Sequence, residues 1–137
     1  MLCNAEDSTR HAENVRRKLE SEIRNHKIVL YSKSYCPFSR VVKRILDGYQ
    51  INDLKVIELD YQQDMSLMQD HLKEKTGIRT VPQLFIDSKF IGDQRTVKAM
   101  ENDGTLENVM LRAADPFTKD LGIEIQAGPQ QPPGFLT

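Results

Sequence analysis

Residues 28–39, IVLYSKSYCPFS, decide the fold, because a short apolar run ends in a cysteine that proline follows at once. The run is rich in β-formers and too short for a helix, whereas the apolar residues after Pro37 recur at helical spacing. Proline suits the first position of a helix, where its missing N–H group would have no partner anyway. The sequence therefore predicts that Cys36 lies where a strand gives way to a helix.

A cysteine in that position is expected to be reactive. Unpaired N–H groups and the positive end of the helix dipole face its sulfur and stabilise the thiolate over the thiol. The alternative is an ordinary buried thiol, because cysteine is among the most buried residue types. The combination of strand, Cys-Pro and helix favours Cys36 as a catalytic nucleophile.

The composition is that of an ordinary globular domain. The chain has 137 residues, of which 39% are hydrophobic and 28% charged, and its formal net charge is −1. Its basic residues are spread out and no apolar stretch approaches the length of a membrane span, so we expect no nucleic-acid or membrane partner. Two cysteines, Cys3 and Cys36, cannot form a disulfide framework, and the first residues lack the apolar core of a signal peptide. We therefore expect a reducing, intracellular setting in the cytoplasm.

Helical and strand patterns alternate along the chain. A narrow apolar stripe predicts a helix over residues 8–25, with Ser8 as its cap. The remaining patterns predict helices over residues 37–47, 64–75, 96–102 and 105–114, and strands over residues 28–31, 55–59, 83–86 and 90–91.

These patterns divide the chain into three parts. Residues 1–14 are expected to be a flexible N-terminal segment with the helix start, and residues 15–114 to form the folded domain. Residues 115–137 hold four of the six prolines and are expected to be an extended or disordered tail, in which residues 121–125 dock loosely.

The order of elements predicts an α/β fold: a central mixed four-stranded sheet with helices on both faces. The first two strands should be parallel through a right-handed crossover, and the last two should form a hairpin. Ligands in such sheets bind outside the carboxyl ends of the parallel strands. Cys36 is predicted to stand there.

Three motifs together resemble the glutaredoxin family: SKSYCPFS at residues 32–39, TGIRTVPQLFI at residues 76–86 and FIG at residues 90–92. The resemblance covers about residues 15–114 and implies a thioredoxin-like fold. It implies that Cys36 attacks a glutathione mixed disulfide, that Pro82 is cis, and that the backbone of Val81 pairs with glutathione. Dithiol members have a second cysteine where this chain has Ser39, which makes the pattern monothiol.

The resemblance also implies a glutathione site. Lys33 and Gln69 match side chains that bind the glycine carboxylate, and Arg79 matches a further positive charge beside it. Tyr35 matches the aromatic residue that flanks the sulfur. Taken alone, Lys33, Gln69 or Arg79 could equally be a solvated surface residue. The implied set, which contains no metal ligand, is Lys33, Tyr35, Gln69, Arg79, Thr80, Val81, Pro82, Asp93, Arg95 and Thr96.

Residues 92–96, GDQRT, depart from the family pattern of two glycines, a small residue and an acidic pair. In the family, this loop presents N–H groups to the γ-glutamyl carboxylate and an acidic side chain to its ammonium. Asp93 adds bulk and negative charge there, while Thr96 removes the acidic partner. Thr96 is still a candidate helix cap, and Arg95 can offset Asp93. We therefore expect weaker glutathione binding than in typical members.

Three functions remain open. The favoured one is a monomeric monothiol enzyme that removes glutathione from mixed disulfides, with glutathione as cosubstrate, glutathionylated proteins as partners and no metal. The second is an iron–sulfur carrier that holds a [2Fe-2S] cluster across a dimer, although such carriers typically have glycine in place of Pro37. The third is a non-catalytic interaction module. The sequence also leaves open whether Cys3 resolves the mixed disulfide or is a stray thiol.

Overall fold

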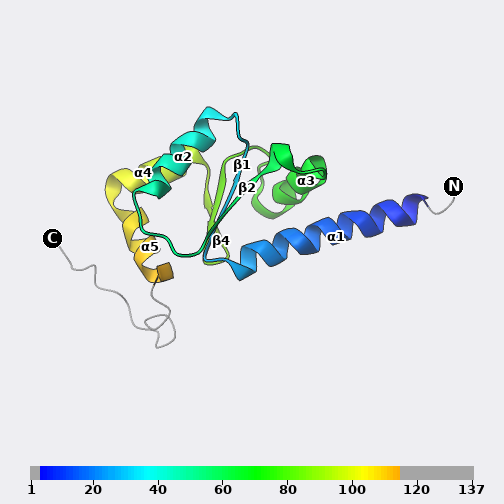
Figure 1. Cartoon of the computed structure of the whole chain (residues 1–137), viewed down its shortest axis with the longest axis horizontal. Coiled ribbons are helices and arrows are strands. Elements are labelled where there is room, and N and C mark those ends of the chain that lie inside the picture. The colour runs from blue at the N-terminus through cyan, green and yellow to red at the C-terminus, as the bar shows by residue number, and fades with distance from the viewer. Residues whose placement is uncertain (1–3, 115–137) are drawn as a thin grey trace.

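The computed structural model describes residues 4–114, and the side chains of residues 8–113 (Figure 1). Cys3 and the predicted tail therefore lie outside the described residues. The described residues form five helices, four strands and one short 3-10 turn. In chain order the elements are α1 (Asn4–Asn25), β1 (Ile28–Ser32), α2 (Pro37–Asp47), β2 (Leu54–Glu58), η1 (Leu59–Tyr61), α3 (Met65–Thr76), β3 (Gln83–Ile86), β4 (Lys89–Gly92), α4 (Gln94–Asp103) and α5 (Thr105–Ala114).

The four strands form one mixed sheet in the order β2-β1-β3-β4. Strand β1 pairs in parallel with β2 and antiparallel with β3, and β3 continues into β4 as a hairpin. The hairpin turn consists of Asp87 and Ser88, both at positive φ (55° and 69°), which suits the right-handed twist of the strands that it joins. The predicted mixed sheet and thioredoxin-like fold are confirmed.

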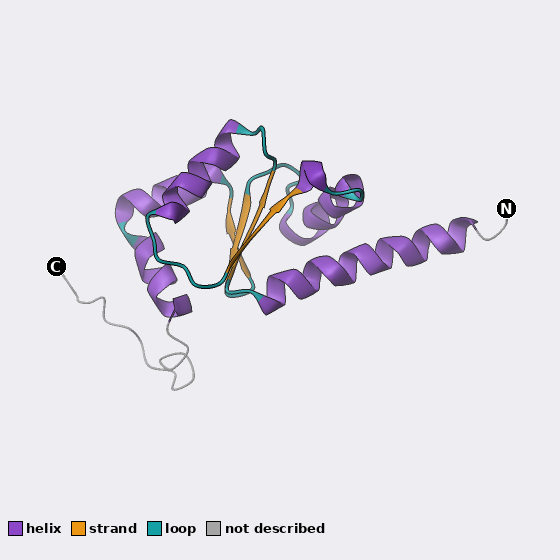
Figure 2. Cartoon of the chain, viewed as in Figure 1, coloured by secondary structure: helices purple, strands orange, loops and turns teal. Residues whose placement is uncertain are grey.

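Helices cover both faces of the sheet (Figure 2). Helices α1 and α3 pack on one face, where the rings of Tyr31 and Phe85 meet edge to face with their centroids 5.9 Å apart. Helices α2, α4 and α5 pack on the other face, against Leu30 and Leu84. Neighbouring strand residues thus point to opposite faces. Because both faces are buried, the two central strands β1 and β3 read as apolar runs, whereas the edge strand β2 keeps exposed residues such as Lys55.

Most predicted boundaries match the structure within two residues, and two differences need an explanation. Helix α1 begins by Asn4, before the expected cap Ser8, since alanine and glutamate favour helix in that stretch. The predicted second strand was extended through Leu59, but the structure ends β2 at Glu58 and turns residues Leu59–Tyr61 into η1. Among the described residues, no helix combines the length and apolar character needed to cross a bilayer.

Candidate active site

Cys36 is the N-cap of α2, in the extended conformation, and Pro37 occupies the first helical position. The Cys36 N–H group donates to the carbonyl of Lys33 at 3.0 Å, which closes a turn before the helix. The Cys36 carbonyl accepts from the N–H group of Arg40 at 3.1 Å, as the first bond of the helix. The predicted junction of strand and helix at Cys36 is therefore confirmed, and the thiol is partly exposed there.

The surroundings of the sulfur favour its anion. Burial raises the pKa of the Cys36 thiol, but the Ser39 hydroxyl and the N–H groups of Ser39 and Phe38 lower it, with a further contribution from the charge of Lys33. The net effect places the pKa of Cys36 below its ordinary value. A thiolate is the nucleophilic form of cysteine, so the site is suited to attack on a disulfide.

Ser39 contributes to this effect in a way that the sequence did not indicate. Its side chain is fully buried, and its hydroxyl makes no hydrogen bond of normal geometry to another described residue. Its proximity to Cys36 nevertheless lowers the thiol pKa, because ionisation of the sulfur gives this donor a strong acceptor. Ser39 therefore does more than leave the motif without a second thiol, because it also stabilises the Cys36 thiolate.

The segment around Val81 lies against the thiol. The Cys36 sulfur is 4.0 Å from the carbonyl oxygen of Val81, and the Val81–Pro82 peptide bond is cis, as the family resemblance implied. Val81 is half-buried and Pro82 is buried, whereas Thr80 is exposed. The structure thus brings Cys36, Val81 and Pro82 together at the carboxyl end of β1.

Gln83 fixes the segment that precedes the cis-proline, a role that the sequence analysis missed. Its side chain is fully buried and its amide donates to the carbonyls of Ile78 at 2.8 Å and Thr80 at 3.0 Å. Its amide oxygen accepts from the hydroxyl of Thr76 at 3.0 Å. The signal was a glutamine in the otherwise apolar strand QLFI.

A hydrogen bond links Gln69 on α3 to Arg79 in the loop between α3 and β3. The Gln69 side chain is almost fully buried and donates to the carbonyl of Arg79 at 3.0 Å. The Arg79 guanidinium donates to Asp70 and to the Ser66 hydroxyl, each at 3.1 Å. Gln69 therefore holds the start of the Thr80–Val81 segment, while the positive charge of Arg79 is shared with Asp70.

Asp60 anchors the loop before Cys36 and was also missed. Its carboxylate accepts from the Ser34 N–H group at 2.9 Å and from the Ser34 hydroxyl. These hydrogen bonds hold the pKa of Asp60 below its ordinary value, against a smaller opposing effect of burial, and the charge of Lys33 lowers it further. The 3-10 turn η1 brings Asp60 to this loop. The sequence did not predict this turn, and for that reason it did not predict the contact between Asp60 and Ser34 either.

Exposed aromatic residues lie on the segments that carry Cys36 and Asp60. Tyr35 and Phe38 flank Cys36 in sequence and are 62% and 58% exposed, and Tyr61, next to Asp60, is 73% exposed. Lys33 is half-buried in the same loop. The segment that carries Cys36 therefore presents two exposed rings, Tyr35 and Phe38, and the charge of Lys33 acts on the thiol.

The loop from Gly92 to Thr96 differs from what the sequence predicted. Asp93, and not Thr96, caps α4, since its carboxylate accepts from the Thr96 N–H group at 3.3 Å. Gly92 has a φ of 151°, and a Cβ atom there would lie within 3 Å of the Thr96 side chain. Arg95 is exposed in the first turn of α4. One carboxylate of the chain thus already occupies this helix N-terminus.

No three His, Cys, Asp or Glu residues group as a metal site in the part of the chain that the structure describes.

Comparison with known proteins agrees with this geometry. A family model described as Glutaredoxin matches residues 28–91. An uncharacterized monothiol glutaredoxin of Caenorhabditis elegans is 43% identical over 101 residues, which are 74% of this chain and 69% of that protein. The crystal structure of oxidized glutaredoxin 2 from Chlamydomonas reinhardtii has a TM-score of 0.71 and 32% identity, and the match covers 75% of this chain and 96% of the other.

A buckwheat glutaredoxin–glutathione complex has a TM-score of 0.70 and 30% identity, over 75% of this chain and 93% of the other. The thiol at the start of α2, the cis-proline beside it and these similarities lead to one assignment. The chain belongs to the glutaredoxin family, whose members are thiol–disulfide oxidoreductases.

Proposed function

We propose that this protein is a monothiol glutaredoxin that removes glutathione from mixed disulfides. The observation that carries the proposal is the Cys36 sulfur at the N-cap of α2, with a lowered pKa and with Ser39 where a second thiol would be needed for a disulfide within the motif. The glutathione bound to the buckwheat relative supports the choice of ligand.

The reaction has two exchanges. The Cys36 thiolate attacks the glutathione sulfur of a protein–glutathione disulfide, so that a new disulfide forms between Cys36 and glutathione while the protein thiolate leaves. The thiolate of a second glutathione then attacks the bound glutathione sulfur. This step forms oxidised glutathione and returns the Cys36 thiolate. Because Ser39 carries no sulfur, the second thiol comes from solution.

The proposed glutathione site runs along the segment beside the thiol. The backbone of Val81, next to Pro82 and Thr80, pairs with the tripeptide, and Tyr35 flanks its sulfur. Lys33 is the main cation for the glycine carboxylate, because Arg79 already shares its charge with Asp70. In this arrangement Gln69 acts chiefly by holding the Arg79 carbonyl.

The γ-glutamyl end is proposed to meet the start of α4. A ligand carboxylate there competes with Asp93, which already accepts from the Thr96 N–H group. Arg95, exposed in the same turn, is the cation within reach, and Thr96 offers no charge to the ligand ammonium. We therefore propose a raised KM for glutathione with the nucleophile unimpaired.

Turnover of a glutathionylated peptide, followed with glutathione and a system that reduces oxidised glutathione, tests the proposal. Cys36→Ser should abolish turnover, because a hydroxyl does not attack sulfur at useful rates. Cys3→Ser is the matched control and should leave turnover unchanged. Appreciable activity of Cys36→Ser would contradict the assignment of the nucleophile.

The same preparation separates the alternatives. A visible absorption band in the protein as purified, lost in Cys36→Ser, would indicate an iron–sulfur cluster ligated by this thiolate. A colourless protein without turnover would favour the interaction module. We expect a colourless protein that turns over.

A further inference from the structure

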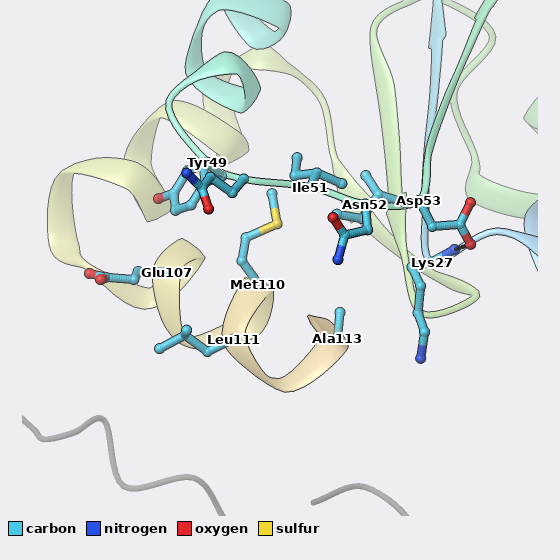
Figure 3. Close-up of a pocket in the computed structure, with 11 residues that line it drawn as sticks. Lys27, Tyr49, Ile51, Asn52, Asp53, Glu107, Met110, Leu111 and Ala113 are labelled. Carbon is cyan, nitrogen blue, oxygen red and sulfur yellow. Dashed lines mark hydrogen bonds between the residues drawn. The ribbon is translucent and has the colours of Figure 1, made fainter. Parts of the chain in front are cut away.

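A cavity lies at the opposite end of the sheet from the thiol. It has a volume of about 440 Å³ and lies between α5, the loop of residues 49–53 and the start of β1 (Figure 3). Strand β1 begins with Ile28 in its wall and ends at Ser32, next to the loop that carries Cys36. The cavity is therefore separate from the candidate active site.

Its walls are chiefly apolar. Ile28, Ile51, Met110 and Ala113 line it, and Figure 3 shows Met110 and Ala113 directed into the space below the loop. A volume of this order is typical of pockets that hold ligands, about 300–1,000 Å³. Such walls favour an occupant with apolar side chains.

The rim carries charge. The Asp53 carboxylate is already engaged, with the His26 ring at 2.7 Å and the Lys27 N–H group at 2.9 Å. The Lys27 side chain extends away from Asp53 along the opening, and Glu107 lies at the far side (Figure 3). An acidic group on the occupant can therefore pair with the Lys27 ammonium.

The chain itself supplies a segment with this chemistry. Helix α5 ends at Ala114, one residue after Ala113 in the cavity wall, so residues 115–137 start at the rim. Residues 121–125, LGIEI, alternate aliphatic residues with Gly122 and Glu124. Seven residues from Ala114 reach up to about 23 Å when extended, which is enough to turn back. In an extended segment, alternate side chains share one face.

We propose that residues 121–125 of the same chain occupy this cavity. Ile123 inserts between Ile51 and Met110, and Glu124 pairs with Lys27 at the rim. The segment covers apolar surface of α5 and of the loop at residues 49–53, and so it joins the C-terminal segment to the folded domain.

Methyl NMR on the full chain, labelled at methionine, tests this docking. The Met110 signal, assigned from Met110→Leu, should shift in Ile123→Asp and stay in place in Leu136→Asp, a matched change outside the segment. Hydrogen exchange of residues 121–125 should be slow in the natural protein and about tenfold or more faster in Ile123→Asp, as expected when one buried aliphatic side chain is lost. The natural protein, Ile123→Asp and Leu136→Asp should show equal turnover by Cys36. Equal turnover would show that both variants are folded.

Charge reversal gives an independent readout. Lys27→Glu and Glu124→Lys should each speed exchange of residues 121–125 roughly two- to threefold, in line with a partly exposed ion pair, and the double variant should restore the natural rate. An unmoved Met110 signal in Ile123→Asp, or exchange in residues 121–125 as fast as in residues 130–137, would overturn the proposal. A Met110 shift that depends on protein concentration would assign the cavity to a second copy and would overturn it as well.

Discussion

The sulfur of Cys36 lies 4.0 Å from the carbonyl oxygen of Val81, a residue 45 positions further along the chain. This approach joins the start of α2 to the entry of β3, because β1 and β3 are neighbours in the sheet. A disulfide attacked by Cys36 therefore lies beside the backbone of Val81. Residues that hold either partner in place, or that stabilise the thiolate, are expected to affect turnover.

Ser39→Ala should raise the pKa of Cys36 and leave the fold as stable as before. The buried Ser39 hydroxyl has no hydrogen-bond partner of normal geometry among the described residues. Its loss therefore deprives the Cys36 thiolate of a donor and leaves no other described group unpaired. Alkylation of Cys36 at pH 6 should slow by about three- to tenfold, since a hydrogen bond to a charged group is worth about 1.5–3 kcal/mol before exposure weakens it. Ser8→Ala, on exposed α1 surface, is the control. An unchanged alkylation profile would show that Ser39 only fills space.

Asp93→Gly should lower the KM for glutathione by up to about tenfold, with kcat little changed. The substitution frees the Thr96 N–H group and removes a negative charge from the start of α4, while glycine costs only a few tenths of a kcal/mol as a helix cap. Steady-state kinetics with varied glutathione measure the effect.

Asp93→Asn keeps an acceptor for the helix cap but removes the charge, so its KM for glutathione should lie between those of the natural protein and Asp93→Gly. Adding Thr96→Asp to Asp93→Gly should lower this KM further, because the new carboxylate can pair with the ammonium of glutathione. Equal KM values throughout would mean that this loop does not limit the use of glutathione.

Gln83→Leu should lower the free energy of unfolding by about 2 kcal/mol, because the carbonyls of Ile78 and Thr80 lose their buried donor. The loosened segment should also raise the KM for glutathione. Chemical denaturation and steady-state kinetics measure the two effects. Gln63→Leu, at an exposed glutamine, should change neither. A destabilised Gln83→Leu protein with an unchanged KM would separate this residue from the proposed glutathione site.

Glu20→Gln should weaken the joint between α1 and α3 in a pH-dependent way. Burial raises the pKa of Glu20, but hydrogen bonds from His71 at 2.6 Å and Lys75 at 3.0 Å outweigh it, so the pKa lies below the ordinary value of 4.5. A depressed carboxyl pKa stabilises the fold above the unfolded value, and this contribution disappears as pH falls through the folded value.

The free energy of unfolding at pH 7 should therefore fall by up to about 1 kcal/mol in Glu20→Gln, and the difference from the natural protein should shrink below pH 4.5. Glu13→Gln, which loses only a 3.8 Å pair with Arg16 on the same helix, is the control and should show little change. A difference that persists at low pH would show that Glu20 acts through packing instead of charge.

Local signals in the sequence were enough to predict most of the fold. Cys36 followed by Pro37 placed a helix start, Gly77 placed a helix end at a φ of 91°, and the apolar runs placed all four strands within one or two residues. Each of these signals acts through a residue's own backbone or its near neighbours, which a single sequence displays.

What the sequence did not predict depends on distant contacts. Asp60 reaches Ser34 only because η1 interrupts a pattern that reads as strand, and Gln83 reads as a surface residue until its partners at Ile78 and Thr80 are seen. The choice between Asp93 and Thr96 as helix cap depends on the turn at Gly92, since both residue types favour that role. The cavity under α5 depends on how three separate segments meet, which no local pattern encodes.

The most direct test of the account is the mass of the protein after one exchange. The Cys3→Ser protein, mixed with an excess of glutathionylated peptide but no free glutathione, should gain one glutathione on Cys36 while releasing an equal amount of peptide thiol. Release of peptide thiol without glutathione on Cys36, or no exchange at all, would contradict the claim that the Cys36 thiolate takes glutathione from mixed disulfides.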